Sequence, residues 1–238
     1  MTGPYGLELN ESCESCKLKG SGFFCQWPET ALKDFDAIRF SSVYPAGAIL
    51  FLEKQTPHGI YVVCNGEVKL SISSTGGKTV ILRVAEPGEA LGLAATLSGK
   101  PHEVTAQTLR PSQVAFAARE PFLRFLRNHP EAYPTVSQQL EKQYLAACEQ
   151  LRTVTLSNSV GERLARLLLE MATHGEQTKG GTRIALKLTQ EEIAELIGTT
   201  RESVTRTFSE FKHHNFVALR GATLTIQNRS ALEDLVKV

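Results

Sequence analysis

Side chains that could recognise DNA bases lie close together in the C-terminal part of this 238-residue chain. Arg201, Glu202 and Arg206 share the exposed side of a predicted amphipathic helix, near its N-terminal end. Arginine can donate two hydrogen bonds to O6 and N7 of guanine, and glutamate can accept one from N4 of cytosine. We therefore expect this helix to enter the major groove of DNA. The alternative interpretation is an ordinary helical hairpin with a solvated charged face.

Three cysteines near the N-terminus form a second group with possible chemistry. Cys13, Cys16 and Cys25 have the spacing Cys-x2-Cys-x8-Cys. Thiolates are soft ligands that suit an iron–sulfur cluster or zinc. A fourth ligand could be Cys64, Cys148, a His or an Asp, or there could be none. It also remains open that these cysteines bind no metal, and buried small hydrophobic residues are the ordinary role for Cys64 and Cys148.

The base-reading side chains belong to the second of two short amphipathic segments that flank Gly198. The first segment has Thr189 as its N-cap, and Glu192 three residues later completes a capping box. Gly198 permits a tight turn, and Thr200 caps the second segment. This pattern is a helix-turn-helix signature. We expect Thr189 either to contact a phosphate or to act only as a cap. The expected DNA-binding residues are Thr189, Thr200, Arg201, Glu202, Ser203, Thr205 and Arg206.

The helix-turn-helix follows a middle region of the chain whose residue pattern predicts a β-barrel. From Ser41 to about Ala118, short strands alternate with Gly-rich turns, which is typical of a barrel or jelly roll. Asn65-Gly66 predicts a hairpin between the strands on either side of it. Short helices are expected between Trp27 and Phe40 and from Pro121 to His129.

A long helix from about Pro134 to Asn158 follows the barrel. Apolar residues recur along it at alternating spacings of four and three, which defines a heptad seam. We expect this seam to pair with a second copy of the chain in a symmetric dimer; packing on the helix's own domain is the alternative. The seam residues are Leu140, Tyr144, Ala147, Leu151 and Val154.

The C-terminal region predicts a winged helix. A helix capped by Asn158 or Ser159 leads, after a loop, to a short strand at Ile184–Leu186, and the helix-turn-helix follows. Two further runs, Phe216–Leu219 and Ala222–Ile226, predict a β hairpin after the recognition helix. The fold class is therefore α+β: an N-terminal β jelly-roll barrel, a long dimerisation helix and a C-terminal winged helix-turn-helix.

Composition excludes several functional classes. The chain is 42% hydrophobic and 21% charged with a net charge of +1, which is typical of a globular protein whose basic residues are local. No apolar run approaches the roughly 20 residues that a membrane helix needs. The start has no signal-peptide pattern, so we expect a cytoplasmic protein. No nucleophile–base constellation, P-loop or hydride-cofactor fingerprint indicates an enzyme.

The order of these elements resembles the Crp/Fnr family of bacterial transcription regulators. The most specific motif is Thr200-Arg201-Glu202-Ser203-Val204-Thr205-Arg206; Tyr61–Val68 and Pro87-Gly88-Glu89 carry the resemblance in the barrel. The resemblance implies a homodimer on double-stranded DNA, with RNA polymerase as a further partner. An arginine at position 201 resembles the catabolite-activator branch and implies TGTGA-like half-sites. The expected domains are a cysteine segment (1–30), a sensor barrel (31–133), a dimerisation helix (134–158) and a DNA-binding domain (159–238).

The resemblance indicates DNA binding but does not identify the effector. The cyclic-nucleotide branch has Gly-Glu-Leu and an Arg-Ser or Arg-Thr pair, whereas this chain has Gly92-Leu93 and His102-Glu103. We therefore expect no cyclic AMP binding, and we expect His102 at the surface, like His213 and His214. The oxygen-sensing branch holds a [4Fe–4S] cluster with N-terminal cysteines and one barrel cysteine, but here the matching barrel position falls near Val114-Ala115. A regulator gated by another small molecule, or one without any effector, remains an alternative.

Overall fold

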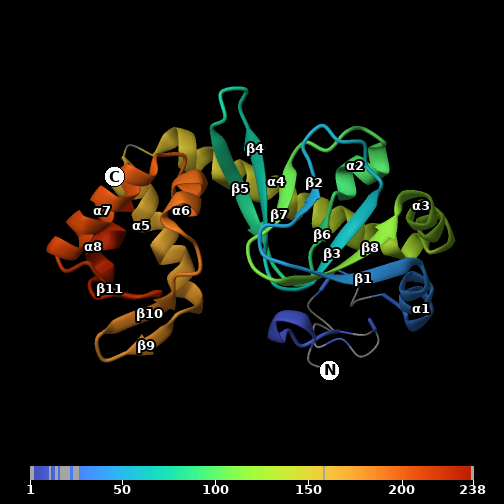
Figure 1. Cartoon of the computed structure of the whole chain (residues 1–238), viewed down its shortest axis with the longest axis horizontal. Helices are drawn as coiled ribbons and strands as arrows, with labels where there is room; N and C mark the ends of the chain where they lie inside the picture. The colour runs from blue at the N-terminus through green and yellow to red at the C-terminus, as the bar shows by residue number, and fades with distance from the viewer. Residues whose placement is uncertain are drawn as a thin grey trace. The chain divides into compact units, whose positions relative to one another are not determined.

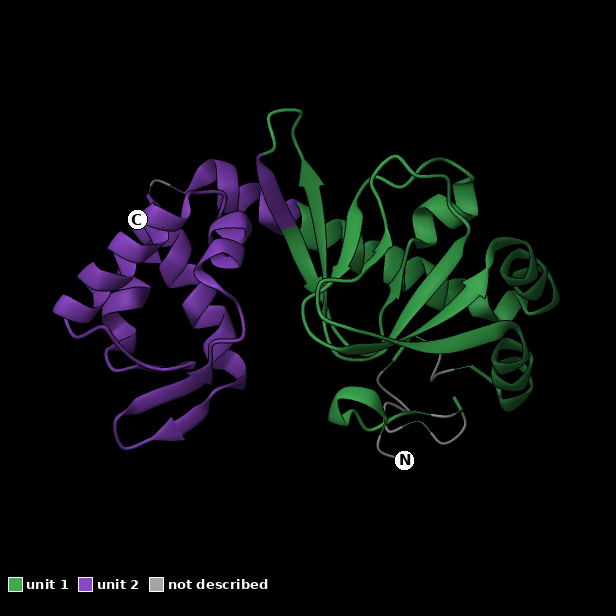
Figure 2. Ribbon diagram, in the orientation of Figure 1, with its two compact units in different colours: residues 1–77, 82–147 green, residues 78–81, 148–238 purple. Residues whose placement is uncertain are grey.

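The computed structural model describes residues 3–10, 12–13, 16, 22–23, 27–157 and 159–236. The chain divides into two compact units (Figure 2). The first comprises Met1–Gly77 and Leu82–Ala147, and the second comprises Lys78–Ile81 and Cys148–Val238. None of the helices in the described part of the chain is long and apolar enough to cross a membrane.

The barrel consists of two four-stranded sheets, as the sequence predicts (Figure 1). One sheet has the order β1-β8-β3-β6, and the other has the order β2-β7-β4-β5. The strands are β1 (Arg39–Tyr44), β2 (Ile49–Phe51), β3 (Gly59–Asn65), β4 (Val68–Ser73), β5 (Thr79–Ala85), β6 (Ala90–Leu91), β7 (Thr105–Thr108) and β8 (Ser112–Ala118).

The hairpin that we expected at Asn65-Gly66 is wrong. β3 and β4 follow each other in the chain but lie in different sheets, so the turn carries the chain from one sheet to the other. Gly66 has a φ of 95°, and a Cβ there would lie 2.1 Å from Oγ of Ser112. The glycine is required for this close crossing, not for strand pairing. The turn at Gly76-Gly77 does join neighbouring strands, β4 and β5.

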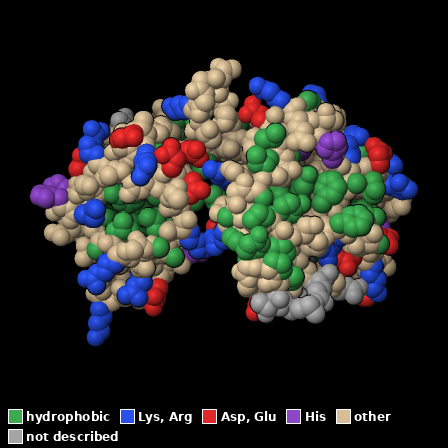
Figure 3. Space-filling model, viewed as in Figure 1, with side chains coloured by type: hydrophobic (Ala, Val, Ile, Leu, Met, Phe, Trp, Pro, Cys, Tyr) green, Lys and Arg blue, Asp and Glu red, His purple; other side chains and the backbone are tan. Residues whose placement is uncertain are grey.

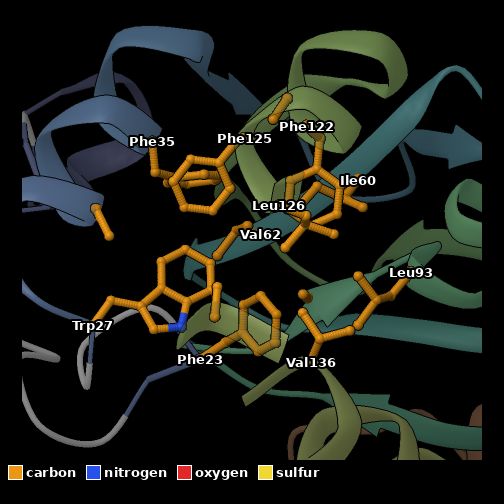
Figure 4. Close-up of a cluster of buried hydrophobic side chains, with 14 of the residues drawn as sticks. Phe23, Trp27, Phe35, Ile60, Val62, Leu93, Phe122, Phe125, Leu126 and Val136 are labelled. Atoms are coloured by element: carbon orange, nitrogen blue, oxygen red, sulfur yellow. The ribbon is translucent and has the colours of Figure 1, made fainter. Parts of the chain in front are cut away.

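Helices cover the outer face of the first sheet. Helix α1 (Glu29–Ile38) and helix α3 (Arg119–Asn128) confirm the two short helices, and Phe35 and Phe125 are buried where they meet. Trp27 packs 5.1 Å from the Phe125 ring, between ring centroids, and 5.5 Å from Phe23 (Figure 4). The sequence did not predict helix α2 (Leu93–Ser98), which follows Gly92. Three-residue 3-10 turns occur at Pro4–Gly6, Pro130–Ala132 and Ala172–His174.

Helix α4 (Tyr133–Leu156) is the predicted long helix, within one residue at its start. Asn158 lies outside the described residues, so Ser159 is the cap that the structure records. Its side chain accepts a hydrogen bond from the Glu162 backbone N–H, at the start of helix α5 (Val160–Met171).

The second unit is a winged helix with two hairpins. Strands β11 (Val217–Arg220) and β12 (Thr223–Ile226) form the predicted wing, and β12 also pairs with β10 (Gly181–Ala185). Strand β9 (Glu176–Thr178) pairs with β10 where the sequence indicated only a loop. Helix α8 (Arg229–Val236), which was not predicted, buries Leu232.

Candidate nucleic-acid interface and sensor sites

The first helix of the helix-turn-helix, α6 (Gln190–Ile197), begins with the predicted capping box. The Thr189 hydroxyl accepts from the Glu192 backbone N–H at 3.2 Å, and the Glu192 carboxylate accepts from the Thr189 backbone N–H at 2.8 Å. The side chain of Thr189 is nevertheless exposed. The structure therefore shows Thr189 as a cap whose side chain is exposed, and the phosphate contact stays a prediction.

Gly198 ends α6 in the left-handed conformation, with a φ of 65°. A Cβ on this residue would lie 2.9 Å from Cγ1 of Val154. Both the turn conformation and the close neighbour therefore require glycine at this position.

The recognition helix, α7 (Arg201–His213), divides into a buried and an exposed face. Val204, Phe208 and Phe211 are buried, as predicted, and Thr207 lies with them. Ser203 is half-buried, and its backbone N–H donates to the Thr200 hydroxyl at 3.3 Å. The exposed residues at its start are Arg201, Glu202, Thr205 and Arg206. The residues expected to contact bases are therefore exposed together in the first turns of α7.

Gln190 is a residue of this surface that the sequence did not single out. The Thr205 hydroxyl lies 2.5 Å from Oε1 of Gln190 and also lies 3.0 Å from the Arg201 carbonyl. This contact fixes the start of α6 against the exposed face of α7. No local pattern indicates it, because it joins residues 15 positions apart.

Lys and Arg side chains are spread over the visible face of the second unit, with acidic side chains among them (Figure 3). His213 and His214 are exposed at the end of α7, as expected. Basic groups are therefore exposed on this unit although the net charge of the chain is only +1.

The residues of the predicted seam on α4 differ in their surroundings: the two end residues are packed within the chain, and the middle ones are exposed. Leu140 packs against the core of the first unit, and Val154 lies against Gly198. Between them, Tyr144 is 68% exposed, Leu151 is 63% exposed, and Ala147 is also exposed. The middle of the helix thus exposes large apolar side chains.

His102 is buried, so its expected place at the surface is wrong. The residue is 4% exposed, and its ring stacks on Phe51 with 3.9 Å between ring centroids. A Cβ at Gly92 would lie 2.9 Å from its Cε1. Burial lowers the pKa of His102 and so disfavours the charged imidazolium. The alternating pattern of buried and exposed residues in a strand could not predict the burial of His102, because this residue lies in the loop before β7.

A buried ion pair connects the β5–β6 loop with α4. Arg83 donates to the Glu89 carboxylate at 2.6 Å, and Lys142 lies 3.4 Å from it. Burial alone would raise the pKa of Glu89, but the two cations outweigh it and hold this pKa below its ordinary value. A cavity of about 420 Å³ opens beside this pair and is also lined by Phe23, Thr135 and Gln139, among others.

The described cysteines of the N-terminal segment lie near the barrel. The Cys13 backbone N–H donates to the Asp36 carboxylate at 3.2 Å, and Cys13 packs against the same core as Cys64. Burial raises the pKa of the Cys13 thiol to about 12 and that of Cys64 to about 11. Arg39, whose side chain is 5% exposed, opposes both shifts.

Cys25 lies outside the described residues, so its expected ligand role is not placed. Within the described ranges, no group of three or more His, Cys, Asp or Glu side chains is arranged to hold a metal ion. Cys148 is half-buried on α4.

Two family models match this chain. A cyclic nucleotide-binding domain matches residues 42–129, and a Crp-like helix-turn-helix domain matches residues 162–235. Together they span more than half of the chain and correspond to the barrel and the winged helix.

Individual relatives agree with this assignment. A CRP-like cAMP-activated global transcriptional regulator of Mycobacterium tuberculosis is 25% identical over 79% of this chain and 84% of its own length. The nitrogen fixation regulation protein FixK of Bradyrhizobium diazoefficiens is 24% identical over 94% and 93%.

Solved structures share the fold. FixK2 from Bradyrhizobium japonicum has a TM-score of 0.71 at 21% identity, covering 83% of this chain and 97% of that chain. The c-di-GMP responsive regulator CLP from Xanthomonas campestris has a TM-score of 0.73 at 20% identity, covering 84% and 99%. The family contains transcription regulators and not enzymes. This chain therefore belongs to the Crp/Fnr family as a DNA-binding transcription regulator.

Proposed function

We propose that this regulator reads a palindrome with TGTGA-like half-sites. The observation that supports this most is the open face at the start of α7, where Arg201, Glu202 and Arg206 are exposed together. A guanidinium there can fork onto guanine, and the carboxylate can accept from cytosine. RNA polymerase would be a further partner, and the cytoplasm would be the place of action.

The Arg201→Ala variant tests the base-reading role. It should cost about 1 to 3 kcal/mol on a TGTGA operator and relax specificity at one base pair. The measurement is a competition assay between the operator, single-base variants and random DNA. Arg229→Ala removes a positive charge from α8 instead and should leave the preference for the operator over the other DNAs unchanged. Equal weakening of specific and random DNA by Arg201→Ala would show that Arg201 binds phosphate and reads no base.

The dimer is proposed from the middle of α4. Tyr144 and Leu151 are seven residues apart, so they lie on the same side of the helix, and both are largely exposed. A parallel pairing through this face would bring two recognition helices to half-sites about 34 Å apart. In sedimentation experiments, Leu151→Arg should convert the dimer to a monomer. Tyr133→Arg, at the start of α4 and outside the seam, should not.

For the sensor, we propose a [4Fe–4S] cluster held by Cys13, Cys16 and Cys25. Soft thiolate donors suit such a cluster, and the Arg39 guanidinium would offset the negative charge of the Cys13 thiolate. When bound, the cluster would supply sensitivity to oxygen and redox state. Zinc or metal-free cysteines are the alternatives. Iron and sulfide analysis after anaerobic purification decides between them, and an iron-free protein after anaerobic reconstitution would refute the cluster.

Cyclic AMP is not proposed as the effector. His102 is packed against Gly92, and burial lowers its pKa, which disfavours the positive charge that a phosphate would need. A small molecule other than cyclic AMP is a second candidate for the effector. The cavity beside Glu89 could hold it, because polar side chains, several of them from α4, line this cavity. Saturation with such a ligand would change operator affinity in protein without metal, whereas an effector-independent dimer would show one affinity in every state.

We propose a population shift as the link between sensor and DNA. A change at the cysteine segment or barrel would alter the pairing of α4, and the two recognition helices would then match adjacent major grooves in only one state.

A further inference from the structure

Strand β3 carries a β-bulge where it pairs with β8. Val63 lies opposite Val114 and Asn65 lies opposite Gln113, so the register shifts between them and skips Cys64. A bulge takes the backbone of its extra residue out of the regular ladder. The end of β3 therefore has backbone groups that another segment of the chain can bind.

Residues 8–10 of the N-terminal segment bind to both residues of this bulge. The side-chain amide of Asn10 donates to the Cys64 carbonyl at 3.0 Å. In the opposite direction, the side-chain amide of Asn65 donates to the Glu8 carbonyl at 3.1 Å. The N-terminal segment lies beside the first sheet in Figure 1, and these bonds hold it at the end of β3.

Gln113, which faces the bulge from β8, holds the backbone of Asn10 with its side-chain amide. The Asn10 N–H donates to Oε1 of Gln113, and Nε2 of Gln113 donates to the Asn10 carbonyl, both at 2.8 Å. One side chain thus makes the two bonds that a residue of an antiparallel neighbour strand would exchange. Gln113 is 4% exposed and also donates to the Ser41 hydroxyl at 2.8 Å, which fixes the orientation of its amide.

The docked segment also holds Cys13 against the barrel. Cys13 lies three residues after Asn10, and its backbone N–H donates to the Asp36 carboxylate at 3.2 Å. Its side chain packs against the core of the first unit, and burial raises the pKa of its thiol to about 12. Since the thiolate is the nucleophile, Cys13 is unreactive while the segment is docked.

We propose that the β3 bulge and Gln113 form an intrachain receptor for residues 8–10, and that release of these residues frees Cys13 for reaction. Four hydrogen bonds hold residues 8 and 10 to this receptor. The net contribution of each is small, so the segment can detach while the barrel stays folded. The proposal goes beyond the sensor function proposed above, because it concerns the metal-free chain and requires no cluster.

Amide hydrogen exchange and alkylation of the metal-free full-length protein test the receptor. Gln113→Ala removes both bonds to the backbone of Asn10. It should speed amide exchange in peptides covering residues 3–13, and alkylation of Cys13 by iodoacetamide, by roughly tenfold or more. Mass spectrometry locates both changes. Gln107→Ala removes a side-chain amide from β7 of the same barrel and should leave both rates at those of the unmodified chain.

A second variant places the change on the segment and leaves the barrel intact. Asn10→Pro removes the N–H that donates to Gln113 and should give the same increase in both rates. The two changes combined should add little to either one, because they break the same contact. Alkylation of Cys148 on α4 should proceed at one rate in all of these proteins.

Two results would overturn the proposal. In the first, neither variant speeds exchange in residues 3–13. In the second, exchange becomes faster while the alkylation of Cys13 keeps its rate. If Gln113→Ala also speeds exchange in β3 and β8, the barrel itself has loosened, and the Asn10→Pro variant decides. A chain that incorporates no iron or sulfide but shows the expected changes supports the receptor and refutes only the cluster.

Discussion

The recognition helix and the cysteine region differ in the range of the contacts that build them. The capping bonds of α6 and α7 join residues three positions apart. The bonds that bring the N-terminal segment to the barrel join residues 54 and 103 positions apart. Local contacts leave a signature in neighbouring residues, whereas β-sheet register brings distant residues together without one. The proposed DNA-binding surface can therefore be predicted from the sequence, whereas the contacts of the cysteine region cannot.

The largest effect is expected from breaking the buried charge pair of the first unit. Glu89→Gln leaves the Arg83 guanidinium buried without its carboxylate and should lower the free energy of unfolding by about 3 kcal/mol. Denaturant unfolding measures this change. Glu86→Gln alters an exposed carboxylate in the same loop and should change stability little. Equal effects of the two variants would mean that the ion pair contributes nothing specific.

A smaller effect is expected at the cap of the DNA-binding unit. Thr189→Ala removes the hydroxyl that accepts the Glu192 N–H and should lower stability by about 1 kcal/mol. Thr189→Ser retains the hydroxyl and should restore most of it. If the alanine variant is fully stable but binds all DNA sequences more weakly, Thr189 acts as a phosphate contact and not as a cap.

The smallest effect is expected when the pH is lowered, through His102 of the first unit. Burial lowers the pKa of His102 in the folded protein, so the unfolded chain takes up its proton first as pH falls below about 6.5. Stability should therefore decrease between neutral and mildly acidic pH. His102→Asn should show a weaker pH dependence of the melting temperature than the unmodified chain. An unchanged pH dependence would assign the effect to other groups.

The contrast between local and distant contacts also explains which predictions from the sequence were right and which were wrong. Caps, heptad spacing and the Gly198 turn predicted α4, α6 and α7 because each depends on side chains within a few turns. The hairpin at Asn65-Gly66 failed because a positive φ can serve a crossing between sheets as well as a pairing of strands. The buried place of His102 depends on stacking with Phe51, a residue 51 positions earlier. The closeness of Cys64 to Cys13 likewise depends on register.

The claim that the cysteine region controls DNA reading can be tested by one measurement of operator affinity. Anaerobically reconstituted protein and metal-free protein are compared on the same TGTGA-containing palindrome at one salt concentration. A gated regulator should show affinities that differ by roughly 5- to 150-fold, the usual range of coupling between two sites. Cys13→Ala should remove the difference, and Cys148→Ala should retain it. Equal affinity of the reconstituted and metal-free proteins would contradict the gating and identify a dimer that binds DNA without an effector.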